Sequence, residues 1–426
     1  MTRVRRLRHD TFRSLHNLNY RKYFVGQIVS VSGTWMQGLA QVWLILELTN
    51  RNGTAVGLVT AFQFLPMLLF GSWGGVLADR VDKRKLLLGT QVAAGLLALA
   101  LGIIVAAGAA AVWNVYLMSV LLGFVNVVDN PARQTFVLEM VGREDLPNAV
   151  SLNSVVMNSS RVVGPAIGAL VIDTVGIAPC FFINAASYLA VIAALMMMDA
   201  SSLQRLPRVE RAKGQIREGF RYAWSERMVR TPLLMMAVIG TLAFNFQVVI
   251  PLIATKTFNS AAGGTDALLT GLLLSTMGAG AVIGGLSVAS RRGVSYRRLI
   301  TLSMLMGFSI LAAAAAPTLV TEFLAIFAMG ALSFAFIATA NTTIQLTAAP
   351  EMRGRVMALY AIAFLGSTPI GGPIVGWVSQ QFGARSGFAI GGIATIVATS
   401  VAAWSISRMR EGDELRSPDV MAVSAA

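Results

Sequence analysis

Two acids and four bases occupy seven consecutive positions, 79–85, between two long apolar stretches. Such a cluster can form and break ion pairs, and the carboxylate of Asp79 or Asp82 could bind the positive end of a helix dipole. Orienting a membrane protein requires bases near the membrane surface but no acids. The turn therefore indicates a switchable electrostatic contact, and charges that only fix the orientation are the alternative.

A lone arginine, Arg161, lies at the middle of another apolar stretch, on one helical face with Ser151, Ser154 and Asn158. An arginine at this depth in a bilayer costs about 2.5–3.5 kcal/mol on insertion scales, so it needs a partner or a function. No acid matches its depth. Either amides such as Gln37 and backbone carbonyls hold it, or it binds an anionic part of a substrate.

The first apolar stretch carries polar residues at intervals of three and four positions, which places them on one helical face: Gln27, Ser30, Thr34, Gln37 and Gln41. We expect this face to line a water-filled cavity, with interhelical hydrogen bonding as the alternative. Asn245 and Gln247, in the second half of the chain, are expected to face the same cavity. Phe244 and Phe246 could contact a substrate there or pack in the core.

These side chains must be positioned by membrane helices. The chain has 426 residues, of which 55% are hydrophobic and 13% charged, far from soluble usage. Apolar windows long enough to cross roughly 30 Å of hydrocarbon recur throughout. They predict an all-α membrane protein with twelve transmembrane helices and exclude a soluble enzyme. A basic N-terminus without a cleavage site predicts that the first span is retained.

Charge distribution predicts the orientation of the spans. All but four of the 34 lysines and arginines fall on one side of them; Arg51, Lys256 and Arg385 lie on the other side, and Arg161 lies within a span. Both termini are therefore expected in the cytoplasm. The net charge of +14 is explained by topology, so no nucleic-acid partner is expected.

The predicted organisation has two halves: a cytoplasmic tail (1–22), a six-helix lobe (23–199), a cytoplasmic linker (200–232), a second six-helix lobe (233–407) and a cytoplasmic tail (408–426). In the linker, Ile216, Phe220 and Trp224 recur every four residues on a basic background. This pattern predicts an amphipathic helix at the membrane surface, or a solvated linker helix.

The two halves share a GPxxG motif at matching positions. Gly164, Pro165 and Gly168 form it in the fifth span, and Gly372, Pro373 and Gly376 form it in the eleventh. The same separation relates Ala132 to Ala340. Parallel repeats of this kind are typical of two-lobed secondary transporters. A proline flanked by small residues also predicts a kinkable, close-packed helix, hence a hinge.

The charged turn resembles the signature of a known family. Its residues Gly75, Asp79, Arg80, Lys83 and Arg84 form GxxxDRxxKR. This is similar to GxxxDRxGRR of the major facilitator superfamily, with Asp82 in place of the glycine. The turn and the segment "DNPARQTFVLEMVGREDLPNAVSLNS" resemble the branch that contains the enterobactin exporter and bacterial multidrug efflux proteins. The likeness extends over essentially the whole chain.

The resemblance implies a cytoplasmic gate. In the family, the acid of the motif meets the start of the eleventh span, and its second base pairs with an acid low on the fourth span. Here these residues would be Asp79, Lys83 and Asp129. Asp129 is also the candidate proton carrier by elimination, because both histidines lie in the N-terminal tail. Pairing with Lys83 would instead favour a structural role.

The resemblance of the fifth span to GxxxGPxxGG implies drug export, with Ser160 and Ala169 replacing two glycines. The fourth span has no base before Arg133, so Arg161 is the candidate to replace the arginine of those exporters. No phosphate-binding loop, HExxH motif or paired cysteines occur, so we expect no ATP hydrolysis, no metal and no cofactor.

We therefore expect a proton-coupled exporter, an antiporter of amphipathic small molecules such as drugs or a siderophore, working as a monomer in the cytoplasmic membrane of a bacterium. Its partners would be substrate, protons and lipid. A proton-linked uptake symporter on the same fold is the alternative. A non-transporting membrane sensor is a second alternative.

Overall fold

The computed structural model describes residues 12–204, 215–258, 265–289 and 296–416. In these residues the regular elements are all helical, as expected from the apolar windows. Ten helical segments of the described chain are long and apolar enough to cross a membrane. The fold is therefore that of a polytopic, all-α membrane protein.

The first half begins with a short 3₁₀ helix, η1 (Arg13–His16), and ends with another, η2 (Ala200–Ser202). Asn17, Asn52 and Asp82 each accept a backbone N–H at the start of a helix, which fixes where α2, α3 and α4 begin. Between the 3₁₀ helices lie α2 (Leu18–Leu48), α3 (Gly53–Arg80), α4 (Lys83–Ala106), α5 (Val112–Val175) and α6 (Ala178–Met196).

Helix α5 bends sharply at Gly142, where the backbone leaves the helical region with φ of 74°. A residue with a side chain would be strained in this conformation, so glycine permits the bend. The segment before the bend corresponds to the predicted fourth span, and the segment after it to the predicted fifth span.

The second half begins with α7 (Gln215–Ser225), a helix within the segment predicted as the linker. Phe220 and Trp224 are exposed on it and stack at 5.6 Å between ring centroids; the side chain of Ile216 lies outside the described part. The helices that follow are α8 (Arg227–Leu242), α9 (Phe246–Lys256), α10 (Asp266–Ala289), α11 (Tyr296–Ala315), α12 (Leu319–Thr347), α13 (Arg353–Leu365), α14 (Thr368–Phe382) and α15 (Ala384–Arg416).

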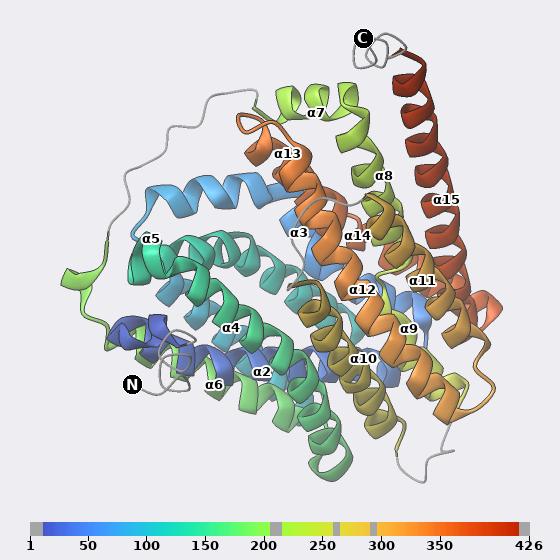
Figure 1. The fold of residues 1–426 in the computed structure, drawn as a ribbon. Helices are drawn as coiled ribbons and strands as arrows, with labels where there is room; N and C mark the ends of the chain where they lie inside the picture. The colour runs from blue at the N-terminus through green and yellow to red at the C-terminus, as the bar shows by residue number, and fades with distance from the viewer. Residues whose placement is uncertain (1–11, 205–214, 259–264, 290–295, 417–426) are drawn as a thin grey trace, which may run out of the picture.

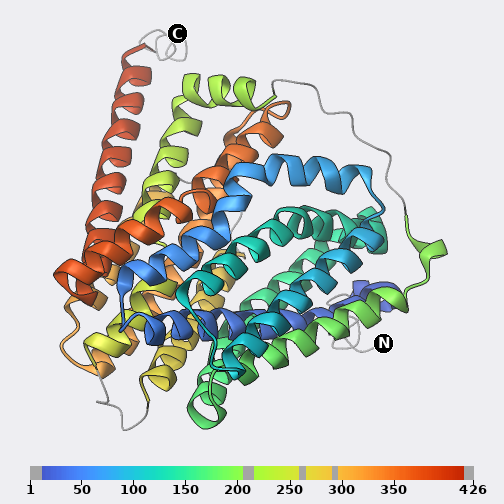
Figure 2. The ribbon, with the colours of Figure 1, turned by 180° about the vertical axis from the view of Figure 1, so that it is seen from behind.

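The helices form two groups, and two helix pairs make most of the contacts between them. We call α2–α6 the N lobe and α7–α15 the C lobe. Helix α3 of the N lobe packs against α14, and α5 packs against α10. Figures 1 and 2 show the lobes crossing near one end and diverging toward the start of α2 and the end of α15. The pairing of α3 with α14 mirrors that of α10 with α5, as expected for repeated halves.

The two ends of this bundle differ. We call the end where the lobes meet, marked by Arg51, Gly53, Asp266 and Gln380, the closed end. The other end, marked by the turn between α3 and α4, the Gly142 bend and the turn between α12 and α13, is the open end. Between described residues, cross-lobe hydrogen bonds run from the closed end to the level of Val162, where Ser275 Oγ donates to the Val162 carbonyl oxygen at 2.7 Å.

Candidate functional site

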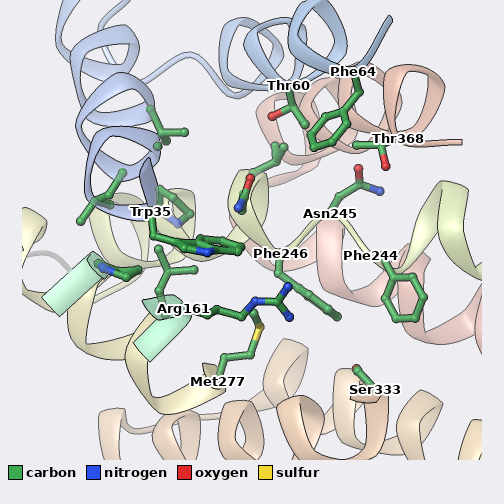
Figure 3. Close-up of a pocket in the computed structure, with 18 of the residues that line it drawn as sticks. Trp35, Thr60, Phe64, Arg161, Phe244, Asn245, Phe246, Met277, Ser333 and Thr368 are labelled. Carbon is green, nitrogen blue, oxygen red and sulfur yellow. The ribbon is translucent and has the colours of Figure 1, made fainter. Parts of the chain in front are cut away.

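A cavity of about 310 Å³ lies between the lobes and is lined from both sides. Helices α2, α3 and α5 contribute the N-lobe wall, and the α8–α9 break, α9, α10, α12 and the α13–α14 junction contribute the C-lobe wall. Its aromatic side chains, several of which Figure 3 shows around the central space, are Trp35, Phe64, Phe244, Phe246, Phe334 and Phe364. A cavity of this size and apolar character suits a small organic molecule.

Arg161 of α5 lines the cavity, as one of its two interpretations required. Its guanidinium carbon lies 4.8 Å from the ring centroid of Trp35 and 4.4 Å from that of Phe334, so it contacts both lobes. Its Nε atom is buried and has no hydrogen-bond partner among the described residues. The expectation that Gln37 holds it is wrong, because Gln37 accepts a hydrogen bond from Asn184 Nδ2 at 2.6 Å.

Asn245 and Gln247 also line the cavity, at the break between α8 and α9. The Asn245 side chain donates from Nδ2 to the Thr241 carbonyl at 2.7 Å, and its buried Oδ1 has no partner in the described structure. Phe244 and Phe246 also line the cavity, but Phe246 is buried and Phe244 packs against Phe246 and Phe364, so core packing and substrate contact both stay open for these rings. Asn245 and Gln247 therefore face the cavity, as the sequence predicted.

The polar face of α2 does not line this cavity. Gln41 Nε2 donates to Ser119 Oγ at 2.6 Å, and Thr34 Oγ1 lies 3.5 Å from the Tyr188 hydroxyl, so this face packs inside the N lobe. Asn158, on α5, donates to the Ser154 carbonyl and is likewise not a lining residue. The polar face of α2 is therefore explained by the alternative prediction, hydrogen bonding between helices. The cavity face of α2, with Trp35 and Leu39, lies about 100° round the helix.

A buried ionic network occupies the N lobe around Asp129, which is 3% exposed. Arg133 donates to Oδ2 from Nε at 3.0 Å and from a terminal nitrogen at 2.5 Å. Oδ1 accepts from Thr90 at 2.6 Å and from Gln91 at 2.8 Å. Arg133 also donates to Gln27 Oε1. Gln27 therefore belongs to this network and not to the cavity.

The predicted pairing of Lys83 with Asp129 is wrong. Lys83 Nζ lies 2.6 Å from Glu139 Oε1, also on α5. Asp129 precedes Glu139 by ten residues, about 15 Å along a helix, which puts it too deep for a base at the start of α4. The implied arrangement, a motif base paired with an acid of the fourth span, is present with a different acid.

The other motif residues are spread over the turn. Arg84 donates to the carbonyl oxygens of Leu195 and Met196 at 2.7 and 2.9 Å, which caps the end of α6. Gly75 is buried in α3, Asp79 is partly buried near its end, and Arg80 is exposed. The turn therefore joins α3, α4 and α6 within one lobe.

The GPxxG glycines are sites of close backbone approach. A Cβ on Gly164 would lie 2.5 Å from Trp35 Cβ, and Gly168 packs against Met36, so α5 fits tightly on α2. A Cβ on Gly376 would lie 2.4 Å from the Gly53 carbonyl oxygen, across the lobes. Gly372 approaches Gly57 in the same way. Pro165 and Pro373 lie inside α5 and α14, and a hinge at either motif stays a prediction.

Two functional candidates were missed. Phe334 lies on α12, which is apolar on all sides and offers no periodic signal. Glu322, on the same helix, is fully buried, and neither carboxylate oxygen has a hydrogen-bond partner in the described structure. The sequence places Glu322 near the external end of a span, which does not by itself reveal burial.

Known proteins similar to this chain are transporters. The profile of a family described as transmembrane secretion effectors matches residues 9–423. The staphyloferrin A transporter of Staphylococcus aureus is 24% identical over 394 residues, covering 89% of this chain and 94% of that protein. The multidrug efflux pump Tap of Mycolicibacterium fortuitum is 25% identical over 405 residues, covering 91% and 95%.

Two further likenesses fit the same branch and fold. The enterobactin exporter EntS of Shigella boydii is 26% identical over 271 residues, covering 63% of this chain and 62% of that protein. A crystal structure of a mutant peptide transporter POT superposes with a TM-score of 0.74 at 11% identity, covering 92% of this chain and 95% of that one. The latter likeness concerns the fold alone.

Proposed function

We propose a function for this chain from one premise: it belongs to the family of transmembrane secretion effectors in the major facilitator superfamily. Its full-length relatives include multidrug and siderophore transporters of bacteria. It is thus a multi-pass membrane transporter of small molecules. We infer that it is a proton-coupled exporter of amphipathic molecules, drug-like or siderophore-like, in the cytoplasmic membrane of a bacterium.

Twelve crossings are consistent with the helix lengths. Helix α2 has 31 residues, enough to span a bilayer. Helix α5 has 64 residues, about 96 Å if straight, and its bend at Gly142 divides it into two crossings. Counting α2 once and α5 twice raises the ten apolar segments to twelve. The membrane-spanning parts of the two lobes are proposed to keep the predicted boundaries, 23–199 and 233–407.

Charge placement supports a cytoplasmic open end. Arg51, Lys256 and Arg385 lie at or beside the closed end, where Arg51 pairs with Asp266 and Lys256 donates to Gln380 Oε1. Most other bases of the described residues lie toward the open end, and positive charge concentrates on the cytoplasmic side of bacterial membrane proteins. We therefore place both termini in the cytoplasm and interpret the conformation as cytoplasm-open.

The single observation that carries the transport proposal is the cavity between two lobes whose cross-lobe hydrogen bonds, among the described residues, run from the closed end to the level of Val162. Substrate would enter from the cytoplasm, contact Arg161, Asn245 and Gln247, and leave after the lobes rock to open the other end. A sensor without transport would not require a charged side chain such as Arg161 in a cavity within the membrane.

Proton coupling is assigned to Asp129. It is buried, and Arg133 is its nearest counter-ion. For Asp129 to take up a proton, Arg133 must move away, and a rocking of the lobe helices could provide that movement. Exchange of the Arg133 contact for a proton would then link conformation to the proton gradient. The gate residues Gly75, Asp79, Arg80, Lys83 and Arg84 are proposed to seal the open end in the opposite state.

Everted membrane vesicles test this proposal. Energised vesicles containing the protein should accumulate a panel of drugs or dyes, and a proton uncoupler should abolish accumulation. Vesicles with Asp129→Asn should lose uphill accumulation but retain downhill exchange. Uptake in the opposite direction, or accumulation that ignores the uncoupler, would contradict proton-driven export.

A further inference from the structure

We propose that the cavity selects anionic amphipathic ligands, with a carboxylate bound by Arg161 and an apolar, preferably aromatic body among the surrounding rings. This inference rests on the proposed function only in treating the ligand as cargo. The binding preference itself follows from the charge and geometry of the cavity.

The cavity carries an uncompensated positive charge. Among its described lining residues, Arg161 is the one ionisable side chain. An arginine within a membrane span is energetically costly unless an anion or polar groups compensate it. Contacts with the Trp35 and Phe334 rings offset some of this cost, but an aromatic ring supplies no negative charge. A bound anion would supply the missing compensation.

Nearby acids cannot provide it. Asp129 already accepts hydrogen bonds from Arg133, Thr90 and Gln91. Glu322 lies on the same helix as Phe334 but twelve residues earlier, about 18 Å along the axis. No described carboxylate lies within ion-pair distance of Arg161. The charge is thus available to a ligand.

The geometry favours a carboxylate in particular. The guanidinium carbon lies over the rings of Trp35 and Phe334, and Figure 3 shows the guanidinium in the space beside Phe246 and Met277. The donors of a guanidinium point outward in its plane, in a fork that matches the two oxygens of a carboxylate. Because the buried Nε has no hydrogen-bond partner in the described structure, the protein leaves donor capacity on Arg161 for a carboxylate.

The remaining cavity is suited to an amphipathic body. The rings of Phe64, Phe244 and Phe364 supply apolar contact. Asn245 Oδ1 and Ser333 Oγ are buried, line the same cavity and have no partner in the described structure, so a ligand hydroxyl or amide N–H could satisfy either. A carboxylate at one end and a hydrogen-bond donor at the other would use all three groups.

Binding measurements on the purified full chain test the proposal. Isothermal titration in phosphatidylcholine nanodiscs, which contain no anionic lipid to compete, would compare three probes that share one ring: naphthylacetate, neutral naphthylacetamide and cationic naphthylethylammonium. We expect naphthylacetate to bind about 10- to 100-fold more tightly than the other two, since charge-assisted hydrogen bonds contribute about 1.5–3 kcal/mol.

Variants assign that preference to Arg161. Arg161→Gln should lower naphthylacetate affinity to that of the amide and leave amide affinity within about threefold. Because the substitution removes an uncompensated charge from a membrane span, the variant should insert and fold. Arg161→Lys should retain an intermediate preference, since lysine keeps the charge but not the fork. Arg297→Gln, exposed and outside the cavity, is the matched control and should bind like the parent protein.

Several results would overturn the proposal: equal or tighter binding of naphthylethylammonium, a carboxylate preference that survives Arg161→Gln, or no binding of any probe. These results leave the exporter proposal standing if vesicles still accumulate neutral or cationic dyes. Conversely, selective carboxylate binding without energised accumulation would refute export but retain the anion site. The two failures are therefore distinguishable.

Discussion

The closed and open ends of the bundle are held by different kinds of contact. At the closed end, polar contacts join the lobes: Arg51 pairs with Asp266 at 2.9 Å, and Gly53 N donates to Gln380 Oε1 at 2.9 Å. At the open end, the ion pairs between described residues stay within a lobe. Lys83 pairs with Glu139 in the N lobe, and Arg355 pairs with Glu218 in the C lobe.

This difference separates contacts that choose a state from contacts that build a lobe. Cross-lobe contacts at the closed end must break when that end opens, so their free energy shifts the equilibrium between states. Within-lobe contacts at the open end do not join the lobes in this conformation, so their loss should act first on stability. Substitutions at the two ends should therefore have different consequences for transport and for unfolding.

Locking the closed end should have the largest effect. In a Cys180→Ala background, a thiol-reactive bismaleimide joining Arg51→Cys to Asp266→Cys should abolish energised accumulation in vesicles, because the lobes cannot separate. The background is mild, since Cys180 is a small, buried core residue. Either single cysteine treated with the reagent is the control. Full transport by the cross-linked protein would show that the closed end does not open.

A side chain added where the backbones of the two lobes approach closely should have the next largest effect. A Cβ on Gly57 would lie 2.3 Å from the Gly372 carbonyl oxygen, so Gly57→Val should force α3 from α14 and disfavour the closed-end contact. We expect transport to fall at least tenfold (about 1.4 kcal/mol or more) while membrane insertion persists. Gly89→Ala meets no atom within 4 Å and is the matched control. Equal activity of both variants would contradict a tight crossing.

The open end should respond in stability. Lys83 and Glu139 side chains are 11% and 9% exposed, so Glu139→Gln leaves a nearly buried ammonium without its partner. Removing one member of such a pair costs about 3 kcal/mol, which should lower the thermal unfolding midpoint in detergent by several degrees. The exchanged pair, Lys83→Glu with Glu139→Lys, should recover most of it. An unchanged unfolding midpoint in Glu139→Gln would show that the Lys83–Glu139 pair does not stabilise the fold.

Asp79 separates the gate hypothesis from simple topology. If its carboxylate seals the open end in the opposite state, Asp79→Asn should lower transport several-fold without altering insertion or unfolding. Protease accessibility and vesicle transport measure these separately. Transport near the parent level would remove the gate assignment and leave the turn with an orienting role.

The smallest effect is expected at Arg51. Its side chain is 47% exposed, and exposed ion pairs contribute about 1 kcal/mol or less. Arg51→Gln should shift the equilibrium between states at most about fivefold toward separation at the closed end, with high salt producing a similar shift in the parent protein. A complete loss of transport would show that this pair has a role beyond holding the end together.

The sequence predicted polar positions better than their partners. Periodicity placed Gln27, Gln37 and Gln41 on one face of α2, but not the element that this face meets, and they hydrogen-bond inside the N lobe. The charged turn was found from composition, yet Lys83 pairs with Glu139 because helix depth decides the partner.

The sequence could not predict which aromatic side chains line the cavity. Trp35 and Phe334 become binding residues only because α2 and α12 bring their rings to Arg161. Neither helix shows a pattern that separates a cavity ring from a packed one. By contrast, Arg161 was identifiable because an arginine within a span is costly wherever it lies.

Distance measurements between the lobes at both ends test alternating access most directly. Spin labels at exposed positions would pair Lys85→Cys with Glu351→Cys at the open end, and Ala107→Cys with Thr318→Cys toward the closed end, in Cys180→Ala protein in nanodiscs. On protonation or ligand binding, we predict that the open-end distance shortens while the closed-end distance lengthens. Distances that change together at both ends, or at neither, would contradict a transporter that rocks about the Arg161 cavity.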